Sequence, residues 1–448
     1  MSLNGNNILA GASGQATGYD INQSIRLNDD DSPYLSRTAG TATSNRIGTL
    51  SFWAKRGNLG GGNAFFSNHS DANNRTYVGF DADKIQMYGK ISGSTNVELV
   101  TTQVFRDPAA WYHIVISVDV TQSSASDRVK FYVNGSQITD FSTATYPAQN
   151  TDFPLLSKTN MQVGAHYSSS IGDYYDGYLA EFHFIDGQAL TPASFGESNE
   201  DTNQWQAIKY SGSYSGNSFY LKFASGAIGT DSSGLGNTFT ATNLSSTTSV
   251  SLDSPTNNFA TLNPLIKPAV GTTTYKEGNL KAQNDNWDCI LGSQSRSSGK
   301  WYWEVAGVGA TIANGYKVGI TTAAINANAS ISHDQAGSMT YQINGTKTIA
   351  STNTSYGASY AQNDIIGIAV DMDASTIQWY KNNAAQGSVS FSGGMENADS
   401  FVPLTSMAKG SNDCYSYYNF GQDSSFGGNF TAQGNGGDGE DFYYTPPT

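Results

Sequence analysis

The sequence predicts an all-β protein that contains two β-sandwiches. Two hairpin patterns lie far apart in the chain: an alternating strand ends in an aspartate, and a polar turn leads to an aromatic-bearing strand that ends at asparagine. They span Trp111–Asp119 with Val129–Gly135, and Asp364–Asp373 with Thr376–Asn383. Alternation indicates strands with one buried and one solvent-facing side. No segment has the pattern and length of an ordinary helix, and good helix formers are scarce, so a pair of sandwiches is expected.

The first strand-dense region covers residues 22–200, after an N-terminal arm at residues 1–21. Its predicted strands include residues 24–27, 49–54, 77–80, 84–88 and 176–186. In the second of these, Leu50 and Phe52 are expected on one face and Trp53 on the other. A single helical turn is predicted at residues 191–196, with Thr191 as its cap and Gly196 as its end.

The second strand-dense region covers residues 263–425. Its predicted strands include residues 299–305, 316–320, 338–343, 364–373, 401–406 and 414–421. Between the regions, residues 201–262 are expected to form an ordered bridge, because apolar residues such as Phe219 and Phe239 need burial. Residues 426–448 form a Gly-rich C-terminal tail that is expected to be irregular.

Composition and charge exclude several partners. The net charge of −14 and the pI of about 4.6 predict a surface that repels nucleic acid and anionic membranes. Lys and Arg are scattered singly, and no window approaches 18 apolar residues, so neither nucleic-acid binding nor membrane insertion is expected. Only 13% of the residues are charged, but 12% are aromatic, which supplies hydrophobic cores.

The first 14 residues lack a cationic start and a long apolar run, so no secretory signal is expected there. A polar, weakly charged, Tyr-rich composition without an export signal fits a bacteriophage virion protein, and a trimmed secreted protein would fit as well. The two cysteines, Cys289 and Cys414, are too few for a disulfide scaffold. Burial as two small hydrophobic thiols is favoured, while a single bridge stays open.

The residues of the first region resemble a laminin-G/concanavalin-like jelly roll. The resemblance is carried by Ser24–Leu35, Leu50–Ala54, Trp111–Val115, Phe131–Gly135 and Gly177–Phe184. The second region resembles a SPRY domain, also a concanavalin-like sandwich, through Gly299–Val305, Val318–Ile320, Asp364–Asp373, Ile377–Asn383, Phe401–Leu404 and Asn419–Gly421. The tandem order is similar to that of structural proteins of marine tailed phages. In those proteins more residues follow a Tyr-Thr-Pro-Pro sequence like the one that ends this chain.

Enzymatic chemistry is the weaker alternative. Glycoside hydrolysis needs two carboxylates across a cleft. The nearest pair is Glu181 and Asp186, and strict alternation would put them on opposite faces of the strand, with Phe182 and Phe184 facing away from Glu181. The five histidines show no metal-ligand spacing, and no nucleophile elbow is present. No catalytic residue is therefore predicted, and Asp371 and Asp373 are expected to cap a turn.

No cofactor is predicted either. Laminin-G-like domains often bind calcium at a loop rim through Asp and carbonyl oxygens. The aspartates in or near loops are Asp71, Asp81, Asp83, Asp173 and Asp176. Their spacing matches no calcium loop, and Asp is an ordinary turn residue, so a structural role is favoured.

The best binding feature is the loop of residues 164–176, which mixes Tyr, Ser, Gly and Asp. Tyr gives rigid amphipathic contacts, and Ser and Gly give adaptable hydrogen bonds. Tyr167, Tyr174 and Tyr175 are the candidate ligand-binding residues, although an ordinary solvated loop would have the same composition.

The resemblance implies a non-enzymatic virion protein, in a fibre, an appendage or the capsid surface. It would attach to other virion proteins and bind a host-surface glycan or protein. A secreted bacterial glycan-binding protein is the alternative, and a glycoside hydrolase comes third. Phage fibres are often trimeric, but no heptad stretch is present, so the oligomeric state stays open.

Overall fold

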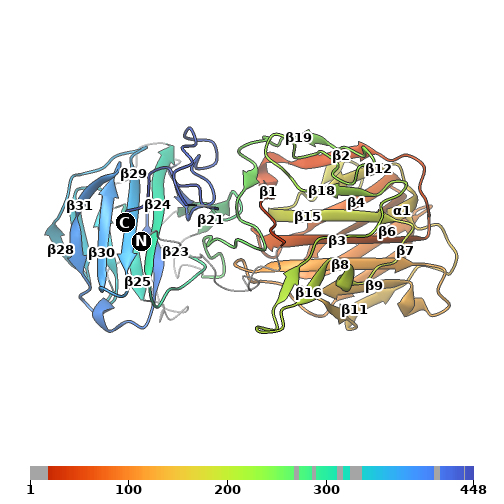
Figure 1. Ribbon diagram of the computed structural model, residues 1–448, viewed down its shortest axis with the longest axis horizontal. Helices are drawn as coiled ribbons and strands as arrows, with labels where there is room; N and C mark the ends of the chain where they lie inside the picture. The colour runs from red at the N-terminus through yellow and green to blue at the C-terminus, as the bar shows by residue number, and fades with distance from the viewer. Residues whose placement is uncertain are drawn as a thin grey trace. The chain divides into compact units, whose positions relative to one another are not determined.

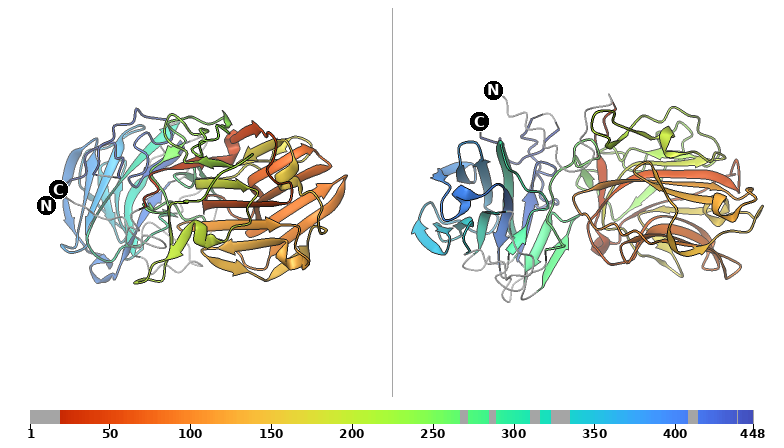
Figure 2. Two further views of the ribbon diagram at one scale, coloured as in Figure 1. Left: turned by 45° about the vertical axis from the view of Figure 1, so that its right-hand side comes forward. Right: turned by 90° about the horizontal axis from the view of Figure 1, so that it is seen from below.

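A computed structural model describes residues 19–266, 272–284, 289–309, 316–322, 335–407, 414–437 and 439–447. The chain forms two compact units that divide between Asn258 and Phe259 (Figure 1). Each unit consists of antiparallel sheets stacked face to face (Figure 2), so the all-β prediction is confirmed. In the described residues the helical segments are short, and no helix is long and apolar enough to cross a bilayer. They are η1 (Asp29–Asp31), η2 (Ala125–Asp127), α1 (Pro154–Ser157), η3 (Pro192–Ser194) and η4 (Met395–Asn397).

The first unit is a sandwich of two eight-stranded sheets, called sheet A and sheet B. Sheet A runs in the order β10 (Ser136–Ile138), β9 (Val129–Val133), β8 (Trp111–Asp119), β3 (Ile47–Arg56), β15 (Gly177–Asp186), β1 (Ser24–Leu27) and β20 (Val250–Ser251), with β18 (Phe219–Leu221) beside β15. Sheet B runs in the order β11 (Phe141–Thr145), β7 (Ser94–Thr101), β6 (Lys84–Ile91), β5 (Asn74–Asp81), β4 (Asn63–Asp71), β12 (Asn160–Val163), β2 (Tyr34–Thr38) and β19 (Thr240–Thr242). Two short hairpins complete the unit: β13 (His166–Tyr167) with β14 (Ile171–Gly172), and β16 (Gly196–Ser198) with β17 (Trp205–Ala207).

The core of the first unit lies between sheets A and B. Leu50 and Phe52 of β3 point into it, and the Phe52 ring stacks on Phe182 at a centroid distance of 4.8 Å. Trp53 faces the other side of sheet A, where it packs with Trp111. The predicted faces of β3 are thus confirmed. The predicted turn after β15 exists as η3, but Thr191 makes no side-chain cap hydrogen bond there.

Strand β15 departs from the predicted alternation. Glu181 has a positive φ of 47°, and the pairing of β15 with β3 shifts register between Ala180 and His183. This is a β-bulge, which changes the face that each following side chain meets. Phe182 therefore joins Leu179 in the core between the sheets, while Ala180 faces the outer side. The strict alternation predicted for this strand was wrong for this reason.

Residues 201–258, expected as part of a bridge, supply strands to the first sandwich. Strand β18 pairs with β15, β19 pairs with β2, and β20 pairs with β1. Phe219 and Phe239 find the burial that their size demands, in the core of this unit. The bridge segment thus contributes strands to both sheets of the sandwich. The boundary between the units follows Asn258.

The second unit is a sandwich of a seven-stranded sheet C and a six-stranded sheet D. Sheet C runs in the order β21 (Thr273–Lys276), β22 (Lys281–Asn284), β33 (Cys414–Asn419), β24 (Lys300–Gly309), β29 (Ile365–Asp371), β30 (Thr376–Lys381) and β31 (Ala384–Ser390). Sheet D runs in the order β23 (Cys289–Leu291), β32 (Phe401–Ser406), β25 (Lys317–Thr322), β26 (Met339–Gln342), β27 (Thr346–Ile349) and β28 (Thr352–Ser355). Trp303 and Trp379 fill its core, and the predicted hairpin is β29 with β30. Cys289 is buried in a small apolar cluster, whereas the side chain of Cys414 lies outside the described residues.

The tail expected at residues 426–448 has no long strand in its described part, but it is tied to sheet C. The carboxylate of Glu304 in β24 accepts hydrogen bonds from the backbone N–H groups of Tyr443 and Tyr444, each at 2.8 Å. Asn419 Nδ2 and the Tyr302 hydroxyl also donate to it, each at 3.1 Å. One buried carboxylate thus accepts from four donors, and two of them, the Tyr443 and Tyr444 N–H groups, anchor the tail.

Replacing Glu304 by alanine is expected to destabilise the second unit by about 2–3 kcal/mol, because buried donors lose their acceptor. Hydrogen exchange of the Tyr443 and Tyr444 amides should accelerate. Burial raises the pKa of Glu304 to about 7, so the folded state holds this proton more tightly than the unfolded chain does. The stability difference between wild type and variant should therefore shrink as the pH rises from about 5 to about 8. Glu396→Ala is the control, since exposed Glu396 accepts only from Gly394 N; equal exchange in both variants would contradict the anchoring role.

Candidate functional site

A pocket of about 350 Å³ lies on the outer face of sheet B in the first unit. It is called the sheet B pocket, and its principal side chains are Arg75, Tyr77, Gln86, Tyr88, Glu98 and His166. The neighbouring positions in β5, β6 and β7 carry Val78, Met87 and Leu99, which face the core. Because side chains alternate along a strand, the same apolar pattern that builds the core points the polar and aromatic residues outward.

His166 forms one wall of this pocket from the loop of residues 164–176. Its Nδ1 donates to Asp173 Oδ2 at 2.7 Å, and its ring packs against Tyr77 at a centroid distance of 4.1 Å. Burial lowers the pKa of His166 although the Asp173 carboxylate opposes this shift. The ring is thus neutral at pH 7, with its proton on Nδ1, and the buried Nε2 is an acceptor that has no partner among the described residues.

Arg75 supplies the positive charge of the pocket. Its Nε is buried and has no hydrogen-bond partner within the described part of the chain. The rings of Tyr77 and Tyr88 lie 6.0 Å apart beside it, and the Tyr77 hydroxyl donates to Gln86 Oε1 at 2.9 Å. Carboxylates of Asp81, Glu98 and Asp173 complete the lining. Aromatic rings with polar groups of both hydrogen-bonding kinds suit a hydroxyl-rich ligand such as a sugar.

The three predicted ligand-binding tyrosines lie in different surroundings. Tyr167 is partly exposed and stacks on His69 at 4.1 Å with nearly parallel rings. Tyr174 is partly exposed, stacks on Tyr34 and donates to Ile171 O within its own loop. Tyr175 is fully buried in the core and donates to Lys55 O, so it cannot contact a ligand and its prediction was wrong.

Composition identified the loop but not the residues that line the pocket. His166 and Asp173 do so, and neither has a distinctive sequence signal, because their partners in β5 and β6 are about 80 to 100 residues away in the chain. Tyr175 directly follows partly exposed Tyr174 in the chain, and nothing local separates the two. Only the packing of the loop on the sheet distinguishes them.

The calcium candidates are occupied by other contacts in several cases. Asp83 forms ion pairs with Arg56 and Arg106, each at 2.7 Å, and Asp71 caps its own turn by accepting from Asn73 N. Asp176 is buried beside Asp29, and this burial raises its pKa well above the ordinary value. Within the described ranges no group of three or more His, Cys, Asp or Glu side chains could hold a metal ion.

The carboxylates considered for glycoside hydrolysis are both buried. Glu181 accepts from the hydroxyls of Tyr19 and Tyr220, and it lies 3.5 Å from His183 Nε2. Asp186 accepts from the backbone N–H groups of Thr43, Ser44 and Asn217 at 2.6–3.0 Å. These bonds fix loops against sheet A. Asp371 and Asp373 accept from Ala374 N and Gly299 N, in agreement with the predicted capping role.

His113 and His183, which both lie in strands of sheet A, are buried. His113 Nδ1 accepts from Trp205 Nε1 at 2.8 Å, so its remaining proton is on Nε2 and points to Ser51 Oγ at 3.0 Å. This tautomer cannot take a proton from Ser51, and burial lowers the pKa of His113 to about 3. The Ser51–His113 pair is therefore structural. His183 is 3% exposed, and His333 lies outside the described residues.

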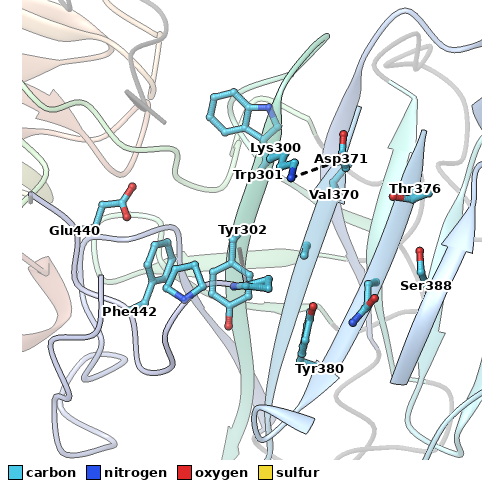
Figure 3. A pocket seen from close by; sticks show the side chains of 14 residues that line it. Lys300, Trp301, Tyr302, Val370, Asp371, Thr376, Tyr380, Ser388, Glu440 and Phe442 are labelled. Carbon is cyan, nitrogen blue, oxygen red and sulfur yellow. Dashed lines mark ion pairs between the residues drawn. The ribbon is translucent and has the colours of Figure 1, made fainter. Parts of the chain in front are cut away.

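The second unit has a pocket of about 160 Å³ between sheet C and the C-terminal segment (Figure 3). Tyr302 meets Phe442 edge to face at 5.1 Å, and Lys300 Nζ lies 3.9 Å from Asp371 Oδ2. Figure 3 shows Tyr380 of β30 on the opposite side of the pocket from Phe442. The lining of this pocket is aromatic and polar, but residues of the C-terminal segment, among them Glu440 and Phe442, already form one side of it.

Two family models match separate parts of the chain. Residues 28–194 match the Concanavalin A-like lectin/glucanases superfamily (Laminin_G_3), and residues 300–422 match the SPRY domain. The chain carries a concanavalin-like domain and a SPRY domain in tandem. The predicted tandem order is confirmed, and the first match ends before residues 201–258, which complete the sandwich of the concanavalin-like domain.

Three solved structures that are similar to parts of the chain are distant from it in sequence. Stonustoxin is 19% identical over 36% of this chain, with a TM-score of 0.29, and the match spans 27% of the stonustoxin chain. The SPRY domain of human HERC1 is 18% identical over 31% of this chain and 87% of its own, with a TM-score of 0.25. The TRIM65 PSpry domain is 13% identical over 36% of this chain and 92% of its own, with a TM-score of 0.27. A search of curated proteins found no match.

Proposed function

We propose that the protein is a non-enzymatic adhesion component of a virion, and that its concanavalin-like domain binds a surface glycan in the sheet B pocket. The observation that carries the glycan assignment is the pair of unpartnered polar groups, Arg75 Nε and His166 Nε2, beside the rings of Tyr77 and Tyr88. A sugar hydroxyl both donates and accepts, so one ligand class satisfies both groups, while its apolar face packs on a ring.

The virion assignment is supported by the composition and by the tandem resemblance to phage structural proteins. The net charge of −14 disfavours contact with nucleic acid, which is itself anionic. Two sandwiches are stable supports for recognition loops, and their attachment to other virion proteins would present the pocket to a host surface. Mass spectrometry of purified virions should detect the chain. Detection only in the supernatant of a bacterial culture would favour the secreted glycan-binding alternative.

Substitution Arg75→Ala should weaken glycan binding by the full chain. A glycan array identifies the ligand, and saturation-transfer NMR measures its affinity. Loss of a charged hydrogen-bonding group is worth about 1.5–3 kcal/mol, so the dissociation constant should rise about ten- to hundredfold. Arg46→Ala is the matched control, since Arg46 is exposed and pairs only with exposed Asp152. Equal loss of binding in both variants, or unchanged binding in Arg75→Ala, would place the glycan site elsewhere.

A further inference from the structure

Arg296 is a buried cation in the second unit without an acidic partner among the described residues. The residue is 8% exposed. Its backbone is fixed to β32 by a pair of hydrogen bonds, Arg296 N to Phe401 O and Phe401 N to Arg296 O, each at 2.9 Å. Burial lowers the pKa of Arg296 to about 10, and no neighbouring charge opposes this shift. The guanidinium remains protonated at pH 7, so the described part of the second unit buries a positive charge without a counter-charge.

The contacts of the guanidinium leave part of its donor edge free. One terminal nitrogen donates to Ser295 O at 3.0 Å, and the other donates to Gln294 Oε1. The plane lies over the ring of Trp301 at 4.2 Å. Arg296 Nε and Gln294 Nε2 are both buried donors without a partner in the described part of the chain. Two orphaned donors on adjacent side chains therefore accompany the unpaired charge.

Both side chains line a pocket of about 40 Å³ whose other walls are largely aromatic. Trp301, Trp303 and Phe401 contribute to these walls. Trp301 is held in place because its Nε1 donates to Ser298 O at 2.7 Å, and Trp303 stacks on Phe401 with a centroid distance of 6.1 Å. The site is thus a mostly apolar hollow lined by the side chains of Arg296 and Gln294, which carry the two buried donors.

We propose that this Arg296 pocket binds a carboxylate, with one oxygen facing Arg296 Nε and the other facing Gln294 Nε2. A carboxylate neutralises the buried charge and accepts a hydrogen bond from each donor, whereas a water molecule would accept the hydrogen bonds without neutralising the charge. The small volume and the planar donor edge favour a carboxylate over a bulkier phosphate. The aromatic walls suit a ligand with a short apolar chain or a ring next to its carboxylate. This site lies in a different unit from the sheet B pocket, so a failure of the proposed glycan binding would not contradict it.

Titration of the full chain with small carboxylates tests the proposal. Acetate, glucuronate and N-acetylglycine are added at constant ionic strength, and Trp fluorescence and the thermal unfolding of the second unit are recorded. A saturable change is expected, because Trp301 and Trp303 border the site and because a bound anion stabilises the folded state. Acetate alone should produce the saturable change if the carboxylate group is the only part of the ligand that the site recognises. Tighter binding of glucuronate would assign the source to an acidic sugar, and tighter binding of N-acetylglycine to a peptide terminus.

Three variants make the result decisive. Arg296→Met keeps an apolar stem and should abolish the response while leaving the unliganded protein at least as stable as wild type, because an unpaired buried charge is removed. Arg296→Lys keeps the charge but lacks the planar fork, so the dissociation constant should rise about tenfold. Gln294→Leu removes the second donor and should weaken binding even if an Arg296 variant fails to fold. The proposal is overturned if wild type shows no saturable response, if Arg296→Met responds like wild type, or if chloride and phosphate act as strongly as acetate.

Discussion

A fragment that ends at residue 200 is expected not to fold, whereas a fragment of residues 19–258 is expected to fold on its own. The shorter fragment includes the whole segment that matches the concanavalin-like family model. It lacks β18, β19 and β20, which pair with three strands of the sandwich. It also lacks the fully buried side chains of Phe219 and Leu221, which pack in the core with Phe182 of β15. Each such side chain stabilises a core by about 2–5 kcal/mol, so the loss is comparable with the whole stability of a typical domain, about 5–15 kcal/mol.

Circular dichroism and thermal unfolding distinguish the two fragments. Residues 19–258 should show a β-sheet spectrum and one cooperative transition, and residues 19–200 should be unfolded or aggregated. The comparison controls for the separation from the second unit, since both fragments lack it. A cooperative transition in the shorter fragment would mean that residues 201–258 only decorate a complete sandwich.

The substitution Lys55→Ala is expected to lower the free energy of unfolding of the concanavalin-like domain by about 3–5 kcal/mol. Lys55 Nζ lies 2.6 Å from Asp253 Oδ2 and 2.8 Å from Asn258 Oδ1, and the Lys55 and Asp253 side chains are both fully buried. Asp253 also accepts from Trp111 Nε1 at 3.0 Å. Burial lowers the pKa of Lys55, and the Asp253 carboxylate opposes this shift. Removal of the ammonium group leaves a buried carboxylate without its counter-charge.

Urea unfolding of the 19–258 fragment measures this effect. Arg46→Ala is the matched control, because the Arg46–Asp152 pair is exposed at 45% and 53% and should contribute no more than about 1 kcal/mol. The double variant Lys55→Met with Asp253→Leu should recover much of the loss, since neither buried charge remains. A single Lys55→Ala variant as stable as the Arg46→Ala control would show that this buried pair is not a determinant of the fold.

The candidate binding residues illustrate the limit of composition as a guide. The composition of the Tyr-rich loop predicted Tyr175 as a ligand-binding residue, but that ring is buried in the core. The groups that line the sheet B pocket, His166 and Arg75, come together because a loop folds back over β5. The same holds for Arg296, whose lack of a counter-charge is a property of its neighbours in space. No spacing in the chain could reveal an absent partner.

The sequence by itself determined the class of fold, the two sandwiches and the hairpins at β8–β9 and β29–β30. Those features depend on alternation within a strand and on turn residues next to it, which are local properties. Only the tertiary structure decided that residues 201–258 complete the first sandwich, that Glu181 forms a bulge in β15, and that Arg296 is buried with no acidic partner in the described ranges. These outcomes depend on contacts between residues far apart in the chain, where packing and the pairing of charges overrule local pattern.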